Sequence, residues 1–360
     1  MTFALAAAGT GGHVFPALAV GEALIERGVA REDILFFGGD RMEKTTVPSA
    51  GFRFVELEIR GFRRSLSLAN FKVVGLVAKA RAKAISTIRQ NDIKAITTFG
   101  GYVAGPVAMA AKATKIPLLL HEQNAIAGLA NRIIVRWASD VFVAFEQAQK
   151  KLGGTVVGNP LRAEMAAFDR DTLRVQARER YGLADSATVL GVLGGSLGAR
   201  ILNEATYQMA MAHESEKFAI VHLCGKEHVD AVNERASRSN LQWVVLDFEE
   251  QMQFFYAACD VVLSRAGALT VSELAVSRTP AVVVPLAIGA GGHQAANAES
   301  LAAAGAIVVL TEDLVDQVPA ALEQILVDGR RRAEMARSYL GYAHPNAAFV
   351  IADAMIEAAA

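Results

Sequence analysis

The sequence predicts an α/β protein made of two doubly wound, parallel-sheet domains in tandem. Short apolar strands alternate with helical stretches along most of the chain, a pattern typical of right-handed βαβ units. The pattern also starts twice, because predicted strands at 3–7 and 189–193 each lead directly into a Gly-rich turn. A length of 360 residues suits about two domains of common size.

The first half alternates strands and helices up to a turn-rich segment at 158–162. Pro16 is expected to begin the first helix, since its fixed φ and missing N–H suit a first turn, and Gly28 is expected to end it. The charged segment 162–184 follows the turns, so we place the domains at 1–160 and 161–343. The strands predicted in this half lie at 3–7, 34–37, 54–57, 95–98, 117–121, 140–143 and 155–157.

The second half repeats this alternation and ends in an Ala-rich helix at 346–360. Its apolar runs are short and are bounded by turn residues, as expected of buried strands in a parallel sheet. The strands predicted here lie at 189–193, 218–223, 242–246, 261–263 and 281–284.

Composition narrows the function classes. The formal net charge of −1 gives no global positive field, so no nucleic-acid partner is expected. Cys224 and Cys259 have neither metal-ligand spacing nor a disulfide framework, which indicates a reducing cytosol. No His-x-x-x-His or Asp-x-Asp pattern stands at a strand end, so we expect no metal and no other cofactor. Neither a signal peptide nor a transmembrane helix is expected.

Gly-rich turns follow three strands, at 9–12, 100–106 and 194–198, and a turn of small residues at 264–273 follows a fourth. One such turn commonly serves tight turning alone, but together they favour a diphosphate-containing ligand at the carboxyl ends of the strands. The dinucleotide fingerprint is incomplete, because Val14 stands where Gly or Ala is required, and no Walker lysine follows any turn. We therefore expect a nucleotide diphosphate held by backbone amides and a helix dipole.

Polar side chains stand at the ends of these strands. His13 ends the first Gly-rich turn and should lie at the sheet edge, in a catalytic or diphosphate-contacting role. The run 121–124 is polar throughout, where one helix cap would suffice. Glu273 is placed to accept hydrogen bonds from ribose hydroxyls, although an acid stabilised by a helix N-terminus is an alternative.

The interval from Ile59 to Asn91 contains no Asp or Glu, although it is rich in Lys, Arg and apolar residues. One interpretation is a helix with a basic, solvated outer face. The other is a patch that binds an anionic membrane surface, with apolar side chains in the interface and cations on the headgroups. The residues assigned to this patch are Arg63, Arg64, Leu68, Phe71, Lys72, Leu76 and Lys79.

Taken together, six motifs in order along the chain resemble the MurG family of N-acetylglucosaminyltransferases. The resemblance implies a GT-B fold, in which two Rossmann-like domains face a cleft and the last helix, 344–360, packs back on the N-terminal domain. It implies an inverting transfer of N-acetylglucosamine from UDP-GlcNAc to the C4 hydroxyl of the muramoyl residue of lipid I, the undecaprenyl-diphosphate-linked MurNAc-pentapeptide. The motifs are 9–16, 100–102, 121–128, 158–162, 194–200 and 265–273.

The resemblance also implies a place of work and partners. The enzyme would be peripheral on the cytoplasmic face of the bacterial cell membrane, with cell-wall synthesis and division proteins as further partners. A UDP-GlcNAc 2-epimerase and a non-catalytic nucleotide-sugar sensor remain alternatives. The epimerase would not need the basic interval, and the sensor would need neither His13 nor the polar run at 121–124.

Site roles follow from the resemblance residue by residue. His13 is the first choice for the catalytic base and Glu122 the second, while Gly9, His13, Gly101 and Tyr102 would contact the acceptor. Glu273 would bind the ribose, and the backbone at Phe248 and Glu249 would cap the uracil. Leu197 and His293 each replace a Gln of the family pattern, and His293 with Gln294 would lie against the sugar hydroxyls. The predicted UDP-GlcNAc contacts are Thr10, Gly11, Gly12, Asn124, Arg162, Ser196, Phe248, Glu249, Arg265, Gly267, Ala268, Leu269, Glu273, His293 and Gln294.

Overall fold

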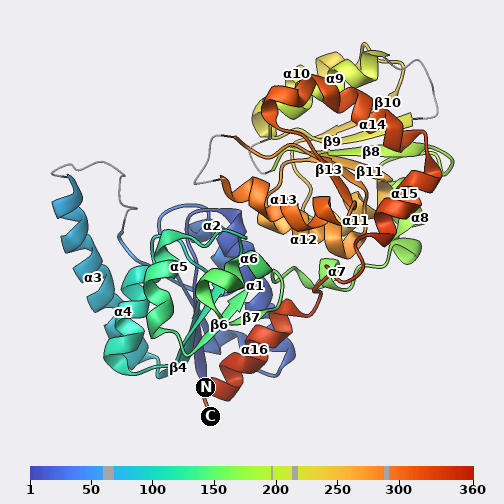
Figure 1. Cartoon of the computed structure of the whole chain (residues 1–360). Coiled ribbons are helices and arrows are strands. Elements are labelled where there is room, and N and C mark those ends of the chain that lie inside the picture. The colour runs from blue at the N-terminus through green and yellow to red at the C-terminus, as the bar shows by residue number, and fades with distance from the viewer. Residues whose placement is uncertain (60–68, 196–197, 213–217, 288–291) are drawn as a thin grey trace. The chain divides into compact units, whose positions relative to one another are not determined.

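The computed structural model describes the chain except residues 60–68, 196–197, 213–217 and 288–291, and it describes residues 69–74 by their backbone alone. The chain divides into two compact units (Figure 1). The first comprises Met1–Ala163 together with His344–Ala360, and the second comprises Glu164–Ala343.

Within the described residues, the first unit contains a seven-stranded parallel sheet in the order β3-β2-β1-β4-β5-β6-β7. The strand order reverses between β1 and β4, and the carboxyl edge of an open α/β sheet at such a reversal point is the usual place for a ligand crevice. The strands are β1 (Thr2–Ala6), β2 (Ile34–Gly38), β3 (Arg53–Glu56), β4 (Ile93–Thr98), β5 (Leu118–Glu122), β6 (Asp140–Val143) and β7 (Thr155–Val156).

Helices cover both faces of this sheet, and β1 shows how the sequence directs them. Phe3 and Leu5 pack into the core beneath α1 and α16, whereas Ala4 and Ala6 pack beneath α3 and α4. This alternation is the two-residue period of a strand buried on both faces. The helices are α1 (Gly11–Glu26), α2 (Glu43–Ser49), α3 (Ala69–Gln90), α4 (Ala104–Thr114), α5 (Leu129–Ile134), α6 (Glu146–Leu152) and α16 (Ala347–Ala358).

The part of the second unit that the structure describes contains a six-stranded parallel sheet in the order β10-β9-β8-β11-β12-β13. Here the order reverses between β8 and β11. The strands are β8 (Thr188–Leu193), β9 (Phe218–Leu223), β10 (Gln242–Leu246), β11 (Val261–Ser264), β12 (Ala281–Val283) and β13 (Ile307–Val309).

In the second unit α9, α10 and α14 lie on one face of the sheet, and α11, α12 and α13 lie on the other (Figure 1). Leu202 of α9 and Leu322 of α14 are fully buried against Leu190 of β8. The helices are α7 (Ala163–Ala166), α8 (Arg170–Arg180), α9 (Arg200–Ala212), α10 (Val229–Ala236), α11 (Met252–Ala258), α12 (Ala268–Ser277), α13 (His293–Ala303), α14 (Val318–Leu326) and α15 (Gly329–Arg337).

The predicted fold class is confirmed, since each unit is a parallel sheet flanked by helices.

The expectation that Pro16 begins the first helix is wrong, because α1 starts at Gly11 and Pro16 lies in its second turn. Proline there costs the helix the hydrogen bond to the Gly12 carbonyl, four residues earlier, at an end where few bonds have yet formed. The strand β13 was not predicted. Among the described residues, no helix is long and apolar enough to cross a membrane.

Candidate functional site

The Gly-rich turns after β1 and β4 meet at the crevice where the first sheet reverses its order. Gly101 has a φ of +78°, and a Cβ at this position would lie 2.3 Å from the Ala8 carbonyl oxygen. A Cβ at Gly100 would lie 3.3 Å from the His13 ring. Glycine is therefore required for the turn after β4 to approach the turn after β1, and the approach brings His13 beside it.

His13 lies in the first turn of α1, where its Nδ1 is 3.1 Å from Thr10 Oγ1. Burial lowers the pKa of His13 below 6.5, and the negative charges of Glu122 and Glu43 partly oppose this. The imidazole is therefore mostly neutral near pH 7. In the tautomer in which Nδ1 donates to Thr10, Nε2 remains to accept a proton.

Glu122, the second choice for a base, is 2% exposed and holds together the loop that follows β5. Its Oε1 accepts hydrogen bonds from the backbone and side chain of Asn124 at 3.0 and 3.3 Å. Its Oε2 accepts from the Gly128 N–H and from Asn131 Nδ2, both at 2.9 Å. A carboxylate engaged on both oxygens is poorly placed to take a further proton, so the geometry favours His13 as the base.

His121 and Gln123, of the polar run 121–124, make hydrogen bonds that stabilise the fold. His121 is fully buried, and its Nε2–H donates to the Gly158 carbonyl at 2.9 Å, while its Nδ1 accepts from Gln123 at 3.0 Å. Burial lowers the pKa of His121 to about 4, so the ring stays neutral. Asn159 donates to the Gln123 carbonyl at 3.1 Å. These bonds attach the segment after β7 to the end of β5.

Two predicted acceptor contacts are joined to a residue that the sequence analysis missed. Tyr102 Oη donates to Glu43 Oε1 at 2.9 Å, and the Gly9 N–H donates to Glu43 Oε2 at 3.2 Å. Glu43 has no motif around it, and the signal that pointed to it was weak: an acid five residues beyond the Gly38 that ends β2. The acceptor contacts of Gly9 and Tyr102 remain predictions.

In the second unit, the turn after β11 ends at the N-terminus of α12, with Gly267 as its N-cap. The exposed amides of this first turn, together with the helix dipole, form a site suited to an anion. Asn297 Nδ2 donates to the Ala266 carbonyl at 3.2 Å, and Gln294 accepts from the Leu286 N–H at 2.8 Å. These bonds bring the start of α13, with His293 and Gln294, beside the α12 turn. Ala268 and Leu269 lie in that turn.

Arg265 holds neighbouring strand ends in place. Its guanidinium donates to the Val284 carbonyl at 3.0 Å and pairs with Glu312 at 2.6 Å. Glu273, one turn into α12, accepts a 2.9 Å hydrogen bond from the Tyr256 hydroxyl. Arg265 and Glu273 are predicted to contact UDP-GlcNAc, and bonds within the fold already orient both side chains.

At the end of β10, Phe248 is 49% exposed, whereas Glu249 is 5% exposed. The Glu249 carboxylate accepts from Tyr181 Oη at 2.7 Å and from Arg180 at 3.0 Å. The Glu249 side chain thus belongs to the fold, and the contact of the 248–249 backbone with the uracil remains a prediction.

The remaining predicted contacts with UDP-GlcNAc lie partly outside the described residues and partly in the first unit. Ser196 and Leu197 lie outside the described residues, but Gly194 and Gly198 of the same turn have no room for a side chain. A Cβ at Gly198 would lie 2.0 Å from the Cys224 carbonyl oxygen, and a Cβ at Gly194 would lie 2.4 Å from the Ala199 nitrogen. Thr10, Gly11, Gly12, Asn124 and Arg162 belong to the first unit, where the Arg162 guanidinium lies 4.7 Å above the Phe15 ring.

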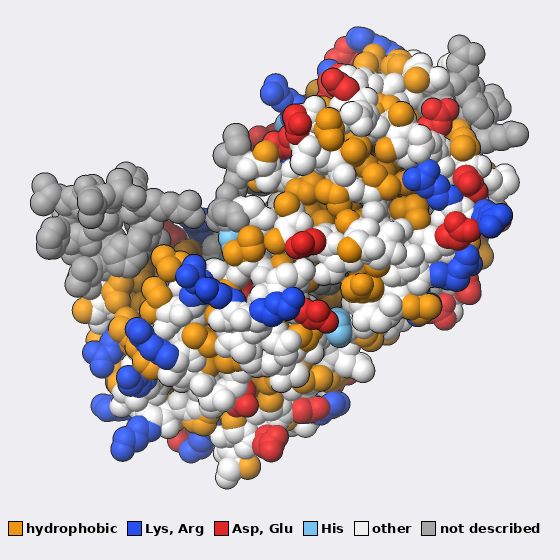
Figure 2. All heavy atoms as spheres, in the orientation of Figure 1, with side chains coloured by type: hydrophobic (Ala, Val, Ile, Leu, Met, Phe, Trp, Pro, Cys, Tyr) orange, Lys and Arg blue, Asp and Glu red, His pale blue; other side chains and the backbone are white. Residues whose placement is uncertain are grey.

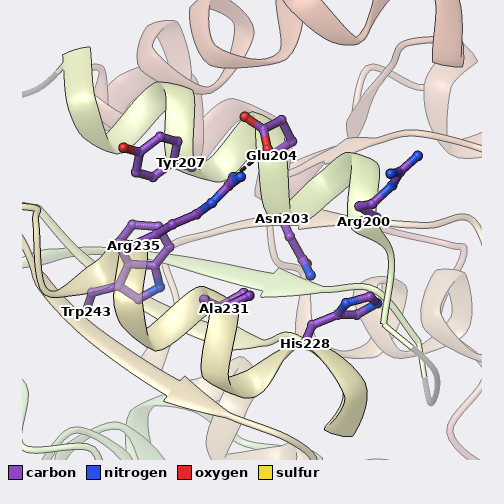
Figure 3. Close-up of a pocket in the computed structure, with 9 residues that line it drawn as sticks. Arg200, Asn203, Glu204, Tyr207, His228, Ala231, Arg235 and Trp243 are labelled. Atoms are coloured by element: carbon purple, nitrogen blue, oxygen red, sulfur yellow. Dashed lines mark hydrogen bonds and ion pairs between the residues drawn. The ribbon is translucent and has the colours of Figure 1, made fainter.

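A cavity of about 260 Å³ lies elsewhere in the second unit, between α9 and α10 (Figure 3). No predicted site residue lines it. Its walls carry the Arg235–Glu204 ion pair, with Arg235 also stacked 4.7 Å from the Tyr207 ring centre. The described residues contain no group of three or more His, Cys, Asp or Glu that is placed to hold a metal ion.

Comparisons with known proteins agree with this arrangement. Residues 3–143 match the glycosyltransferase family 28 N-terminal domain, and residues 189–349 match the family 28 C-terminal domain. The crystal structure of Acinetobacter baumannii MurG covers 99% of this chain and 100% of its own, with a TM-score of 0.80 and 32% identity. A UDP-GlcNAc 2-epimerase from Neisseria meningitidis, bound to UDP-GlcNAc, has a TM-score of 0.70 over 99% of this chain and 100% of its own. At 12% identity, it shares the fold alone.

Two curated relatives bear the name UDP-N-acetylglucosamine--N-acetylmuramyl-(pentapeptide) pyrophosphoryl-undecaprenol N-acetylglucosamine transferase. The protein from Halorhodospira halophila is 38% identical over 352 residues, 96% of this chain and 95% of that protein. The protein from Cellvibrio japonicus is 37% identical over 359 residues, 98% of this chain and 97% of that protein. The chain belongs to glycosyltransferase family 28, in the MurG family of N-acetylglucosamine transferases.

Proposed function

We propose that this enzyme transfers N-acetylglucosamine from UDP-GlcNAc to the C4 hydroxyl of the muramoyl residue of lipid I, with inversion at the anomeric carbon. The observation that carries the proposal is the placing of Gly-rich turns at the reversal point of each sheet, in a chain of this family. Each reversal point is where open α/β sheets bind ligands, so each unit has its own site.

The donor belongs to the second unit in this proposal. The first turn of α12 presents backbone N–H groups to the UDP diphosphate, and its dipole favours the charge that grows as UDP leaves. Such preorganised donors can contribute several kcal/mol to lowering a barrier. Glu273, oriented by Tyr256, accepts hydrogen bonds from the ribose hydroxyls.

The acceptor belongs to the first unit. His13 takes the proton of the attacking C4 hydroxyl as the oxygen bonds to the anomeric carbon and the bond to UDP breaks. Support comes from its neutral ring at the crevice edge and from the hydrogen bonds that already occupy Glu122. Gly11, Gly12 and Asn124, which are predicted to contact UDP-GlcNAc, stand on the same edge.

The proposal also places the enzyme on an anionic membrane through the basic interval at α3. Figure 2 shows Lys and Arg side chains interspersed with hydrophobic ones on the part of the first unit that carries α3 and α4. Lys79, Arg81 and Lys83 are exposed on α3, although Lys79 pairs with Glu58 at 2.5 Å. An exposed pair of this kind is weak, so an anionic headgroup can compete for the lysine. Arg63, Arg64 and Leu68 of the proposed patch lie outside the described residues, as do the side chains of Phe71 and Lys72.

A turnover assay tests the function directly. UDP release is measured from UDP-GlcNAc with lipid I, without it, and with UDP-GalNAc in place of the donor. We expect UDP release that requires lipid I and is accompanied by a disaccharide-linked lipid product. Release of free N-acetylmannosamine without acceptor would instead identify an epimerase, and UDP-GlcNAc binding without any product would identify a sensor.

A further inference from the structure

Glu43 is a fully buried acid whose surroundings are unusual. It is the first residue of α2 and is 0% exposed, yet no ion pair joins it to a cation among the residues that the structure describes. A buried carboxylate is costly unless hydrogen bonds replace its water. Its partners are therefore expected to be specific and to matter for the local structure.

The hydrogen-bond donors to Glu43 come from three loops. Oε1 accepts from the Gly39 N–H at 3.0 Å and from Tyr102 Oη at 2.9 Å, and Oε2 accepts from the Gly9 N–H at 3.2 Å. Gly39 follows β2, Gly9 follows β1 and Tyr102 follows β4, and these strands are neighbours at the reversal point of the sheet. One carboxylate thus connects the loops that form the crevice.

The loops around Glu43 and Tyr102 pack closely because glycines stand next to these two side chains. A Cβ at Gly39 would lie 2.0 Å from Tyr102 Oη, and a Cβ at Gly38 would lie 2.8 Å from Glu43 Cγ. The Tyr102 ring lies 3.6 Å from where a Cβ of Gly9 would stand. Burial and the nearby Glu43 raise the pKa of Tyr102 well above 10, so its hydroxyl remains protonated and donates.

We propose that Glu43 is a positioning residue for the transfer reaction, which holds the turn at 9–12 and Tyr102 in place and so sets the position of His13. This inference rests on the proposed function, because it assumes that His13 acts on the acceptor. The Gly9 N–H is occupied by Glu43 and is therefore closed to a ligand while this bond is intact.

Charge is part of the role. Glu43 and Glu122 are the acids whose charges act on His13, and Thr10 and Gly100 are its neutral neighbours. Asp40 and Arg41 lie beside Tyr102, with the Arg41 guanidinium 5.7 Å from the ring centre. Neutralising Glu43 removes one of the two charges that raise the pKa of His13, and no side chain next to His13 is changed.

The experiment compares Glu43→Gln, Glu43→Asp and Tyr102→Phe in the full chain, with kcat and KM for each substrate, UDP affinity by calorimetry and the pH profile of kcat/KM. In Glu43→Gln an NH2 group replaces one carboxylate oxygen and faces N–H or O–H donors, so at least one of the hydrogen bonds that hold the loops is lost. We therefore expect kcat/KM for lipid I to fall at least tenfold while UDP affinity changes less than twofold. The acidic limb of the profile should move to lower pH in Glu43→Gln. It should stay in place in Tyr102→Phe, which keeps the charge.

Glu43→Asp keeps the charge with a shorter reach and should show the wild-type limb with only part of the rate. If Glu43→Gln does not fold, Glu43→Asp still tests the positioning role, because an unchanged kcat/KM in this variant would overturn it. An unmoved limb and an unchanged kcat/KM in Glu43→Gln would overturn the inference. The inference would also be overturned if Glu43→Gln lost activity only in proportion to its loss of thermal stability, while the acidic limb of its pH profile stayed where it is in wild type. Failure of the proposed function is a separate result, because wild type itself would then show no transfer to lipid I.

Discussion

The Tyr256 hydroxyl donates a 2.9 Å hydrogen bond to Oε2 of Glu273, and it joins α11 to α12 at the turn that follows β11. Tyr256 is fully buried, and burial together with Glu273 raises its pKa well above 10. The hydroxyl therefore stays protonated and donates at every accessible pH. A carboxylate oriented in this way is suited to accept further hydrogen bonds from a pair of ribose hydroxyls.

Replacing Glu273 by Ala should weaken UDP binding by at least about ten- to a hundredfold, because even one hydrogen bond to a charged group contributes about 1.5–3 kcal/mol. Tyr256→Phe should weaken it less, by roughly threefold to tenfold, since the carboxylate remains but is less well oriented. Calorimetry with UDP measures both. Glu299→Ala, at an exposed position on α13, is the control and should bind as wild type does. Equal affinity of Glu273→Ala and wild type would remove the ribose contact from the proposal.

His13→Ala should lower kcat by about a hundredfold or more, the usual contribution of a positioned general base. The pH profile of wild-type kcat/KM gives an independent check. Because burial places the pKa of His13 below 6.5, the rate should rise as pH increases through that lowered pKa and level off below neutrality. His13→Ala should lack this rise. A variant that keeps turnover within a few-fold of wild type would exclude His13 as the base.

Asp260→Ala should strongly destabilise the second unit. Asp260 accepts from Arg178 at 3.0 Å and from the Val189 N–H at 2.8 Å, and Arg178 is 1% exposed. Removing one partner of a buried pair costs about 3–5 kcal/mol, and the Ala184 and Asp185 carbonyls that also bind Arg178 favour the lower end.

The measurement for Asp260→Ala is urea unfolding followed by the fluorescence of Trp243, in a Trp137→Phe background. Arg174→Ala is the control, because Arg174 also pairs with Asp260 but is 31% exposed. It should cost under about 1 kcal/mol. Equal losses in the two variants would mean that burial does not set the strength of this network.

The stability of the first unit should fall with pH between 6.5 and about 4 through His121. The unfolded state binds a proton near pH 6.5, whereas burial keeps the folded pKa at about 4, so the stabilisation is complete above 6.5 and is lost as pH falls. The slope for one such group is about 1.4 kcal/mol per pH unit. Urea unfolding followed by Trp137, in a Trp243→Phe background, should give a smaller slope for His121→Gln than for wild type. Parallel slopes would show that His121 is charged in the fold.

The sheets could be predicted because their signal is local. Apolar strands such as Val261–Ser264 alternate with helices, and the turns at Gly101 and Gly198 need glycine for close backbone approach, which the sequence displays directly. The strand Ile307–Val309 has the same signal after Gly305 and was overlooked. Local pattern therefore determined the layers and the positions of the Gly-rich turns.

Pairings over long sequence distances could not be predicted. The segment 162–184 is charged and poor in apolar residues and marked the domain boundary, yet its Arg178 is buried and pairs with Asp260, 82 positions further along the chain. Glu43 is hidden in the same way, since its donors stand after three different strands. The acid-free interval appeared uniformly basic, but Glu58, just before it, pairs with Lys79 from across the fold.

Membrane binding should depend on the basic interval and on salt. In the triple variant Arg63→Glu, Arg64→Glu and Lys72→Glu, sedimentation with vesicles containing anionic lipid should fall by at least a hundredfold in partition coefficient. Each cation near such a surface contributes about 1 kcal/mol, and reversal adds repulsion. Wild-type binding should weaken as salt shortens the range of the attraction.

A charge-matched control separates a local patch from net charge. Lys150→Glu, Lys151→Glu and Arg330→Glu change the same number of exposed cations on α6 and α15, outside the interval in the sequence. Because the attraction decays within about 10 Å at 0.1 M salt, cations that do not face the surface contribute little, and this variant should sediment nearly as wild type does. Equal losses in the two triple variants would show that overall charge, and not the interval at α3, governs binding. Wild-type protein that stays in the supernatant at low salt would rule the patch out.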